Sequence, residues 1–384
     1  MISPAERAYL LTGVSQNFRP DGRPNLQSRP YTLLHPPSNP TAPPALLSNG
    51  SSRLLLPQNS TNILCSIKSE LVHPAPHRPR AGIVDLTIDL LPYSCTNSAD
   101  RRVLKKKQQS TTEVLRGLMI PYLCDLEELC VLPYKYVWRV NIDVVVLACD
   151  GNLVDACSWA IWGAVQNWTL PKVDAILGNE GNKEKDNITQ SKTGPKVTDE
   201  LLLDGDVAHS IVPKGIESCP IVITVCLMPK LNSTKDAKTA EEFDMTLLSE
   251  EGGSSKSRTC HRIPPQRKQG DAILVTDPTL QEQECSSTQV SFGIDKDGLI
   301  CGIHQYGGGS WSGLGGGCNK GTMPYHMMQP VSNVAVAMAK KVRKLLIGHD
   351  AGKEASIAMT QDETCLGGTR VTQGNFFQSQ FELQ

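Results

Sequence analysis

The stretch that decides the fold is Asp150-Gly151-Asn152-Leu153-Val154-Asp155-Ala156, which joins a predicted strand to a predicted helix. Before it, apolar and polar residues alternate from Trp138 to Val146, the period-two pattern of a strand. After it, apolar residues recur every three or four positions from Leu153 to Trp168, which predicts a helix with one stripe packed on the sheet. A helix start favours phosphate, yet the side chains here are apolar or acidic. The stretch therefore argues against catalysis.

The bulk composition limits the classes of protein that fit. The 384 residues suffice for two ordinary domains, and the formal net charge of -1 means that RNA binding would need a local basic patch. The 13 cysteines include no Cys-x-x-Cys pair and the first residues include no apolar secretion segment, which together favour a reducing compartment. No apolar run approaches the roughly 18 residues that cross a bilayer, so we expect no membrane association.

The first half of the chain predicts strands followed by helices. A short helix is expected from Ala5 to Val14 and another near Thr111 to Ile120. Three strands, separated by turn residues and consistent with an antiparallel meander, are expected at Ser51–Leu56, Asn62–Val72 and Ile83–Leu91.

The second half repeats this order. A strand is expected within Ile221–Met228, another at Asp271–Thr276, and a hairpin around Asp295-Lys296-Asp297-Gly298. Pro330 introduces a last helix, whose expected buried stripe is Val331, Val334, Met338, Val342 and Leu345. We therefore predict a two-part α+β fold with mixed or antiparallel sheets and helices packed on them.

Composition also suggests the domain boundaries. We expect an N-terminal extension at 1–30, a first domain at 31–176, a polar insertion at 177–214, a second domain at 215–348 with a disordered insertion at 231–269, and a flexible tail at 349–384.

Three groups of residues invite a chemical interpretation that their context does not favour. The glycine-rich run 307–317 lacks the Gly-Lys-Ser/Thr ending of a phosphate loop, so we expect a flexible loop. Neither His73 with His77 nor Cys260 with His261 is accompanied by a second ligand pair, so no metal site is expected. The carboxylates Asp277, Glu282 and Glu284 could be catalytic, but charged residues between two strands are usually solvated.

Basic residues gather in one region of the sequence. They flank a predicted strand and comprise Arg78, Arg80, Arg101, Arg102, Lys105, Lys106 and Lys107. Such a region can contact RNA phosphates, although a lysine run is more often a solvated loop. Arg53 starts a predicted strand and could serve RNA or an interface salt bridge.

Five segments in order give the chain a resemblance to a known family. They are Arg19-Pro20-Asp21-Gly22-Arg23 with Arg29-Pro30, Ser48 to Arg53, Cys65 to Ser69, Asp143 to Ala156, and Asp277 to Leu280. Together they resemble the RNase PH family, and within it the non-catalytic ring subunits of the eukaryotic RNA exosome. The resemblance implies a two-part RNase PH-like fold (ribosomal protein S5 domain 2-like), in a ring of six such subunits through which single-stranded RNA is threaded.

The resemblance also implies partners and location. The expected partners are other RNase PH-like ring subunits, RNA-binding cap subunits, associated exoribonucleases and single-stranded RNA, with no cofactor. The expected location is the nucleus, including the nucleolus, and the cytoplasm.

Active members of this family cleave RNA from its 3′ end with phosphate, and the resemblance shows which of their residues differ here. Their arginine after the Gly-Gly-Thr turn falls on Val154, a second arginine falls near Ser110 or Thr111, and their aspartate segment reads Gln281-Glu282-Gln283-Glu284. Glu113 and Arg116 remain in the family pattern. Valine contributes neither charge nor a hydrogen-bond donor, and loss of one such stabiliser commonly costs about 10² to 10³ in rate.

These differences predict no catalytic residue and a degenerate phosphate site at Asn152 and Val154. The candidate RNA-binding residues are Arg101, Arg102, Lys105, Lys106, Lys107, Arg53 and Arg116. Two other functions stay open. One is an active phosphate-dependent 3′–5′ exoribonuclease, which would need substitutes for the missing arginines. The other is a lone RNA-binding protein, which the neutral charge and the lack of aromatic stacking motifs disfavour.

Overall fold

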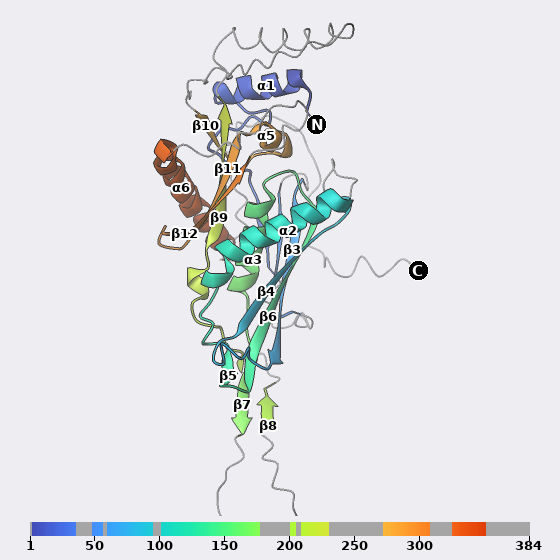
Figure 1. Ribbon diagram of the computed structural model, residues 1–384, viewed down its shortest axis with the longest axis vertical. Helices are drawn as coiled ribbons and strands as arrows, with labels where there is room; N and C mark the ends of the chain where they lie inside the picture. The colour runs from blue at the N-terminus through green and yellow to red at the C-terminus, as the bar shows by residue number, and fades with distance from the viewer. Residues whose placement is uncertain are drawn as a thin grey trace, which may run out of the picture.

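A computed structural model describes residues 2–35, 48–56, 60–94, 101–176, 200–204, 209–229, 272–307 and 325–350. Two sheets form the framework (Figure 1). The first has the order β1-β2-β3-β6-β4, with β5 also paired to β6, and contains β1 (Thr32–Leu34), β2 (Gly50–Leu55), β3 (Asn62–Val72), β4 (Ile83–Leu90), β5 (Cys130–Leu132) and β6 (Tyr136–Ala148). The second has the order β10-β9-β11-β12 and contains β9 (Ile221–Pro229), β10 (Ala272–Thr276), β11 (Thr288–Ile294) and β12 (Ile300–Gly307).

Helices pack on and between these sheets, as an α+β fold requires. The α-helices are α1 (Pro4–Ser15), α2 (Arg101–Leu118), α3 (Leu153–Gln166), α5 (Leu280–Cys285) and α6 (Tyr325–Asp350). Two short 3₁₀ turns, η2 (Ile120–Tyr122) and η4 (Ile216–Ser218), and a two-stranded ribbon of β7 (Val173–Ile176) and β8 (Glu200–Leu203) complete the described elements. The predicted fold class is confirmed, and so are α1, the strands and the hairpin turn between β11 and β12.

The predicted antiparallel meander is wrong at its third strand. β3 pairs antiparallel with β6, and β4 lies on the far side of β6, parallel to it, with Leu86 opposite Ile142. Parallel neighbours need a long crossover connection, and the chain supplies one by passing through α2 between β4 and β6.

The helix after the fold-deciding stretch is buried on nearly every side, not along one stripe. Every residue of α3 is buried except Val154 and Gln166. The hydroxyl of Ser52 in β2 donates to the carbonyl of Ala160 at 2.5 Å, and the indole of Trp159 donates to the carbonyl of Val222 in β9 at 3.3 Å. α3 therefore packs against both sheets and joins the two halves of the fold.

The helix predicted near Thr111–Ile120 begins ten residues earlier, at Arg101. Its first half carries a single buried apolar residue, Leu104, so the apolar periodicity that marks a helix is absent there. Lysine, arginine and glutamine are nevertheless good helix formers. The basic residues from Arg101 to Lys107 thus lie on a helix and not in a loop.

The last helix differs from the prediction at both ends. α6 starts at Tyr325, so Pro330 lies inside it. Its stripe ends on Leu346, which is fully buried, whereas Leu345 is 42% exposed. The four-residue step from Val342 to Leu346 keeps the stripe facing the sheet.

The N-terminal segment packs against the second sheet. Leu10, Leu11 and Val14 of α1 form a small core with Met228 of β9 and Val275 of β10. The segment 16–29 that follows lies under the end of β10, where the backbone amide of Thr276 donates to the carbonyl of Asn25 at 3.0 Å.

Several predicted segments lie outside the described residues. They include most of the two insertions, the tail from 351 and residues 308–317 of the glycine-rich run, so these stay predictions. Among the helices that the structure describes, none is long and apolar enough to span a membrane.

Candidate functional site

The turn between β6 and α3 is tightly packed. Gly151 and Asn152 both adopt left-handed backbone conformations, with φ of 80° and 48°. A Cβ on Gly151 would lie 2.5 Å from the backbone nitrogen of Leu280. Only glycine fits this position, because a side chain would collide with the start of α5. The turn therefore packs directly against the start of α5, in the connection between β10 and β11.

The two residues of the predicted degenerate phosphate site occupy this helix start but are committed to internal contacts. The side-chain nitrogen Nδ2 of Asn152 donates to Asp155 Oδ2 at 3.0 Å and to Asp277 Oδ1 at 3.1 Å. Val154 is half-buried and packs against the main core. The first turn of α3 contains the acidic Asp155 and no basic residue. At this helix start the side chains therefore offer a phosphate no fixed cation.

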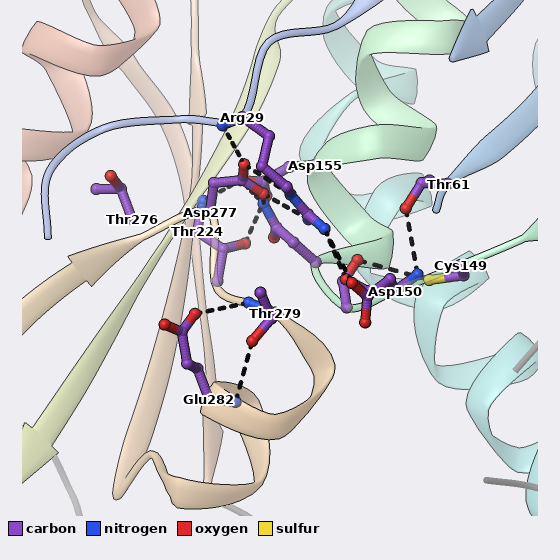
Figure 2. Close-up of polar contacts among 12 residues, drawn as sticks. Arg29, Thr61, Cys149, Asp150, Asp155, Thr224, Thr276, Asp277, Thr279 and Glu282 are labelled. Atoms are coloured by element: carbon purple, nitrogen blue, oxygen red, sulfur yellow. Dashed lines mark hydrogen bonds and ion pairs between the residues drawn. The ribbon is translucent and has the colours of Figure 1, made fainter. Parts of the chain in front are cut away.

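Asp277 lies at the centre of a buried polar network, shown in Figure 2. The guanidinium of Arg29 donates to both carboxylate oxygens of Asp277, at 3.1 Å from Nε and 2.8 Å from Nη2. The backbone amide of Arg29 adds a third bond at 2.7 Å, and Arg23 Nη1 a fourth at 3.2 Å. Arg29 Nη1 also donates to the carbonyl of Asp150 at 2.8 Å, so one arginine ties Asp277 to the β6–α3 turn.

A second buried pair lies beside the first. The side chains of Arg19 and Glu282 are both fully buried and form a two-pronged ion pair, with Arg19 Nε donating to Glu282 Oε1 at 2.8 Å and Nη2 to Oε2. Arg19 also donates to the carbonyls of Thr276 at 3.0 Å and Asp277 at 2.8 Å. Glu282 also accepts a bond from the backbone of Thr279 and so completes a capping box at the start of α5.

The pKa directions follow from burial and charge. Burial alone would raise the pKa of Asp277, but the charge and hydrogen bonds of Arg29, with the charge of Arg23, offset it and lower the pKa below its ordinary value. Burial would likewise lower the pKa of Arg29, yet Asp277 and then Asp150 raise it. Both groups are therefore ionised at neutral pH.

Asp155 behaves differently, because no arginine reaches it. Burial raises its pKa to about 7, against hydrogen bonds from Thr224 and Asn152 that favour the charged form. Asp155 accepts from the amide and the hydroxyl of Thr224 at 2.7 and 2.6 Å, and that hydroxyl also meets Ser291 Oγ at 2.8 Å.

The interpretation of the second-half carboxylates as solvated is therefore wrong for two of them. Asp277 is 4% exposed and Glu282 is fully buried. Their partners Arg19, Arg23 and Arg29 lie about 250 positions away in the chain, and in the sequence these arginines stand out only as parts of a turn and of the family resemblance. The one signal in the sequence is the density of arginines in the segment 16–29, which has few apolar residues. Such a segment is held in place by hydrogen bonds and ion pairs of its guanidinium groups and not by apolar packing.

The candidate RNA-binding residues are only partly brought together. Arg101, Arg102, Lys105 and Lys106 are exposed and Lys107 is half-buried, all on the first half of α2. Arg116 lies about 14 Å further along the same helix and donates to the carbonyl of Leu86 at 3.1 Å. Arg53 lies on β2 and donates to Asn62 Oδ1 at 3.1 Å.

The rest of the basic region is elsewhere. Arg78 and Arg80 precede β4, whereas α2 follows it, so the whole length of a strand of eight residues, roughly 26 Å, separates them from Arg101. The basic residues of the sequence therefore do not form one patch.

No metal site is evident within the described ranges, where no group of three or more His, Cys, Asp or Glu side chains has the arrangement to hold an ion. His73 Nδ1 lies 2.7 Å from the carbonyl of Lys135, and its ring stacks on Tyr136. Cys260 and His261 lie outside the described residues.

Comparison with known proteins agrees with the fold. Residues 45–171 match the first domain of the 3′ exoribonuclease family, RNase PH, and residues 268–313 match its second domain. The chain therefore carries matches to both domains of the RNase PH family.

Its relatives are named as exosome subunits. The chain is 25% identical over 312 residues to exosome complex component Rrp42 of Sulfurisphaera tokodaii, covering 81% of this chain and 86% of the relative. It is 30% identical over 196 residues to exosome complex component RRP45 of Danio rerio, covering 50% of this chain and 46% of the relative. An archaeal exosome core and an Archaeoglobus fulgidus exosome with RNA bound to the active site share the fold, each at 17% identity, a TM-score of 0.52 and 89% coverage of this chain, with 96% and 97% of the matched chains covered.

Proposed function

We propose that the chain is a non-catalytic subunit of the hexameric RNase PH-like ring of an RNA exosome. There it supports 3′–5′ RNA processing and degradation by assembly of the ring and by RNA threading. The processes served include rRNA maturation and mRNA turnover and surveillance. The names of its relatives support the assembly, and the shared fold supports a ring subunit. The proposed partners are other RNase PH-like ring subunits, RNA-binding cap subunits, associated exoribonucleases and single-stranded RNA. The proposed location is the nucleus, including the nucleolus, and the cytoplasm.

One observation supports the proposed absence of catalysis. At the start of α3, where a family member would hold phosphate, Val154 presents methyl groups and the nearby arginines are already paired. Arg29 cannot turn to a phosphate without giving up both of its guanidinium bonds to the buried Asp277, its main partner, which would cost about 3 to 5 kcal/mol. A dianion that must be oriented for attack needs fixed, forked donors.

Burial raises the pKa of the Cys157 thiol in α3, and the charge of Lys107 on α2 offsets only part of that rise, so a lysine charge does reach this helix. A lysine supplies a point charge on a flexible stem and cannot replace two arginine forks. The alternative function, an active phosphate-dependent exoribonuclease, would need this lysine to do so.

Two measurements test the proposal on the full-length chain. Co-expression with candidate RNase PH-like neighbours, followed by size exclusion, tests assembly, and we expect one co-eluting complex. Incubation of the chain alone with single-stranded RNA and inorganic phosphate tests chemistry, and we expect no nucleoside diphosphate. Release of nucleoside diphosphates by the chain alone would establish the exoribonuclease instead, and a chain that elutes alone with every neighbour would exclude the ring.

A further inference from the structure

One aromatic ring stands almost entirely in solvent on a fixed turn. Tyr93 is 93% exposed, the largest value among the large hydrophobic residues that the structure describes. Its backbone is held on both sides: the amide of Ser94 donates to the carbonyl of Leu91 at 2.9 Å, and the amide of Cys149 donates to the carbonyl of Ser94 at 2.8 Å. The ring is therefore presented by a rigid base and has no packing role in the chain itself.

The turn that carries Tyr93 lies between two features already described. Its contact with Cys149 places it directly beside the β6–α3 turn, which begins at Asp150. The amide of Gln108 in α2 donates to Asp89 at the end of β4, four residues before Tyr93, at 3.2 Å. α2 crosses the fold beside α3 (Figure 1), and the charge of Lys107 reaches Cys157 in α3. The basic half of α2 and the ring of Tyr93 thus border the same end of the first sheet.

Exposed cations line the first half of α2. Arg101, Lys105 and Lys106 are exposed, and the first turn of α2 contains no acidic residue. Two carboxylates at this edge have partners among the described residues: Asp89 accepts a hydrogen bond from Gln108, and Asp150 lies 3.7 Å from Arg29. Arg101 and Lys105 lie about 6 Å apart along the helix axis, one turn from each other. A polyanion at this edge therefore meets a cation at each of two successive turns.

We propose that Tyr93 and the exposed cations of α2 form a binding site for single-stranded RNA, in which the Tyr93 ring stacks on an unpaired base while Arg101, Lys105 and Lys106 contact phosphates. An exposed ring at the same end of a sheet as a row of exposed cations suits single strands, because every unpaired base offers a face for stacking. A duplex keeps its bases stacked inside and cannot use the ring. This proposal rests on the proposed function in one respect, the choice of RNA as the polyanion that binds.

The test is equilibrium binding of fluorescent oligouridine to the full-length chain over a series of salt concentrations. We expect Tyr93→Ala to weaken affinity about ten-fold and Tyr93→Phe to keep it within about two-fold, since the phenyl ring still stacks. Tyr93→Ala should leave the slope of log affinity against log salt unchanged. Lys105→Ala with Lys106→Ala should lower the magnitude of that slope by about 1.4, because each lost phosphate contact removes about 0.7 on a single strand.

Matched controls lie at the other end of β4. Tyr134 is also a highly exposed tyrosine, at 70%, and Arg78 and Arg80 are exposed cations. We expect Tyr134→Ala and the double variant Arg78→Ala with Arg80→Ala to bind as the unmodified chain does. A 4-thiouridine strand should crosslink to the peptide that contains Tyr93.

The proposal is overturned if Tyr93→Ala binds like the unmodified chain, if Tyr134→Ala loses as much affinity, or if polyglutamate competes as well as RNA, which would indicate an acidic protein as the partner. Failure of this site is distinct from failure of the proposed function. A Tyr93→Ala chain that still enters the ring tests the site alone, whereas a chain that binds RNA but joins no ring contradicts only the proposed function.

Discussion

Asp155 offers the sharpest test of the buried network, by its replacement with asparagine. An asparagine at this position can reproduce every hydrogen bond of the original side chain. Its oxygen takes the place of Oδ2 and accepts from Asn152 and from the amide of Thr224, and its nitrogen takes the place of Oδ1 and donates to the Thr224 hydroxyl. That hydroxyl then donates to Ser291 Oγ, 2.8 Å away. Asp155→Asn therefore removes one titrating proton and little else.

The expected effect has a definite sign and size. The pKa of Asp155 rises from 3.8 in an unfolded chain to about 7 in the folded one. A pKa that is raised on folding stabilises the protein fully below the unfolded value, and the stabilisation is lost as the pH rises through the folded value. Three pKa units correspond to about 4 kcal/mol, of which about 3 kcal/mol is lost between about pH 5 and about pH 8. Asp155→Asn cannot lose it, so the variant gains relative to the unmodified chain as the pH rises.

The assay is urea unfolding at several pH values, followed by the fluorescence of the tryptophans buried on and beside α3. The quantity of interest is the difference in unfolding free energy between variant and unmodified chain, because all other titrating groups cancel in it. Asp297→Asn, an exposed carboxylate in the β11–β12 turn, controls for the loss of one negative charge. Curves for Asp155→Asn and the unmodified chain that stay parallel over this pH range would refute the reasoning, because Asp155 would then ionise as easily inside the fold as outside.

The remaining predictions concern the arginine network, the tight turn and the phosphate position. Arg29→Ala leaves Asp277 without its main partner and should reduce the free energy of unfolding, measured in urea, by about 3 to 5 kcal/mol. Its control Lys214→Ala breaks an exposed ion pair and should change that free energy by about 1 kcal/mol or less. Equal effects of the two variants would contradict the role of burial. Gly151→Ala should destabilise the fold by more than about 2 kcal/mol, since φ is 80° and a Cβ meets backbone, while Gly117→Ala in α2, where space is open, should stabilise it by about 0.5 to 1 kcal/mol in the same assay. Val154→Arg should release no nucleoside diphosphate from RNA and phosphate, because the second cation and the acidic residues are still missing; robust turnover would show that the chain supplies them.

The sequence was most informative where structure is local. The alternation from Trp138 to Val146 and the three-and-four spacing after Leu153 each report which side of an element is apolar, and both elements lie within a residue or two of their predicted bounds. The same method missed the first half of α2, because lysines and arginines give a helix no apolar period to detect.

The candidate site shows the opposite limit. Asn152 and Val154 were located from the sequence, because a strand-to-helix turn is a local feature. The partners of Asp277 were not, since Arg29 is 248 positions away and a lone aspartate after a strand is usually solvated. Tyr93 was not singled out either, because the sequence does not show whether a tyrosine packs inward or stands in solvent.

By itself the sequence determined the type of most elements, their order, and the absence of a cation after the β6–α3 turn, because period, turn chemistry and residue identity are properties of neighbouring positions. Only the tertiary structure decided that β4 crosses over to lie parallel to β6, that α3 is enclosed by both sheets, and that three N-terminal arginines neutralise two carboxylates from the far end of the chain. Those outcomes depend on which surfaces meet when apolar faces are buried together, and a buried charge must then find its partner wherever the chain happens to bring one.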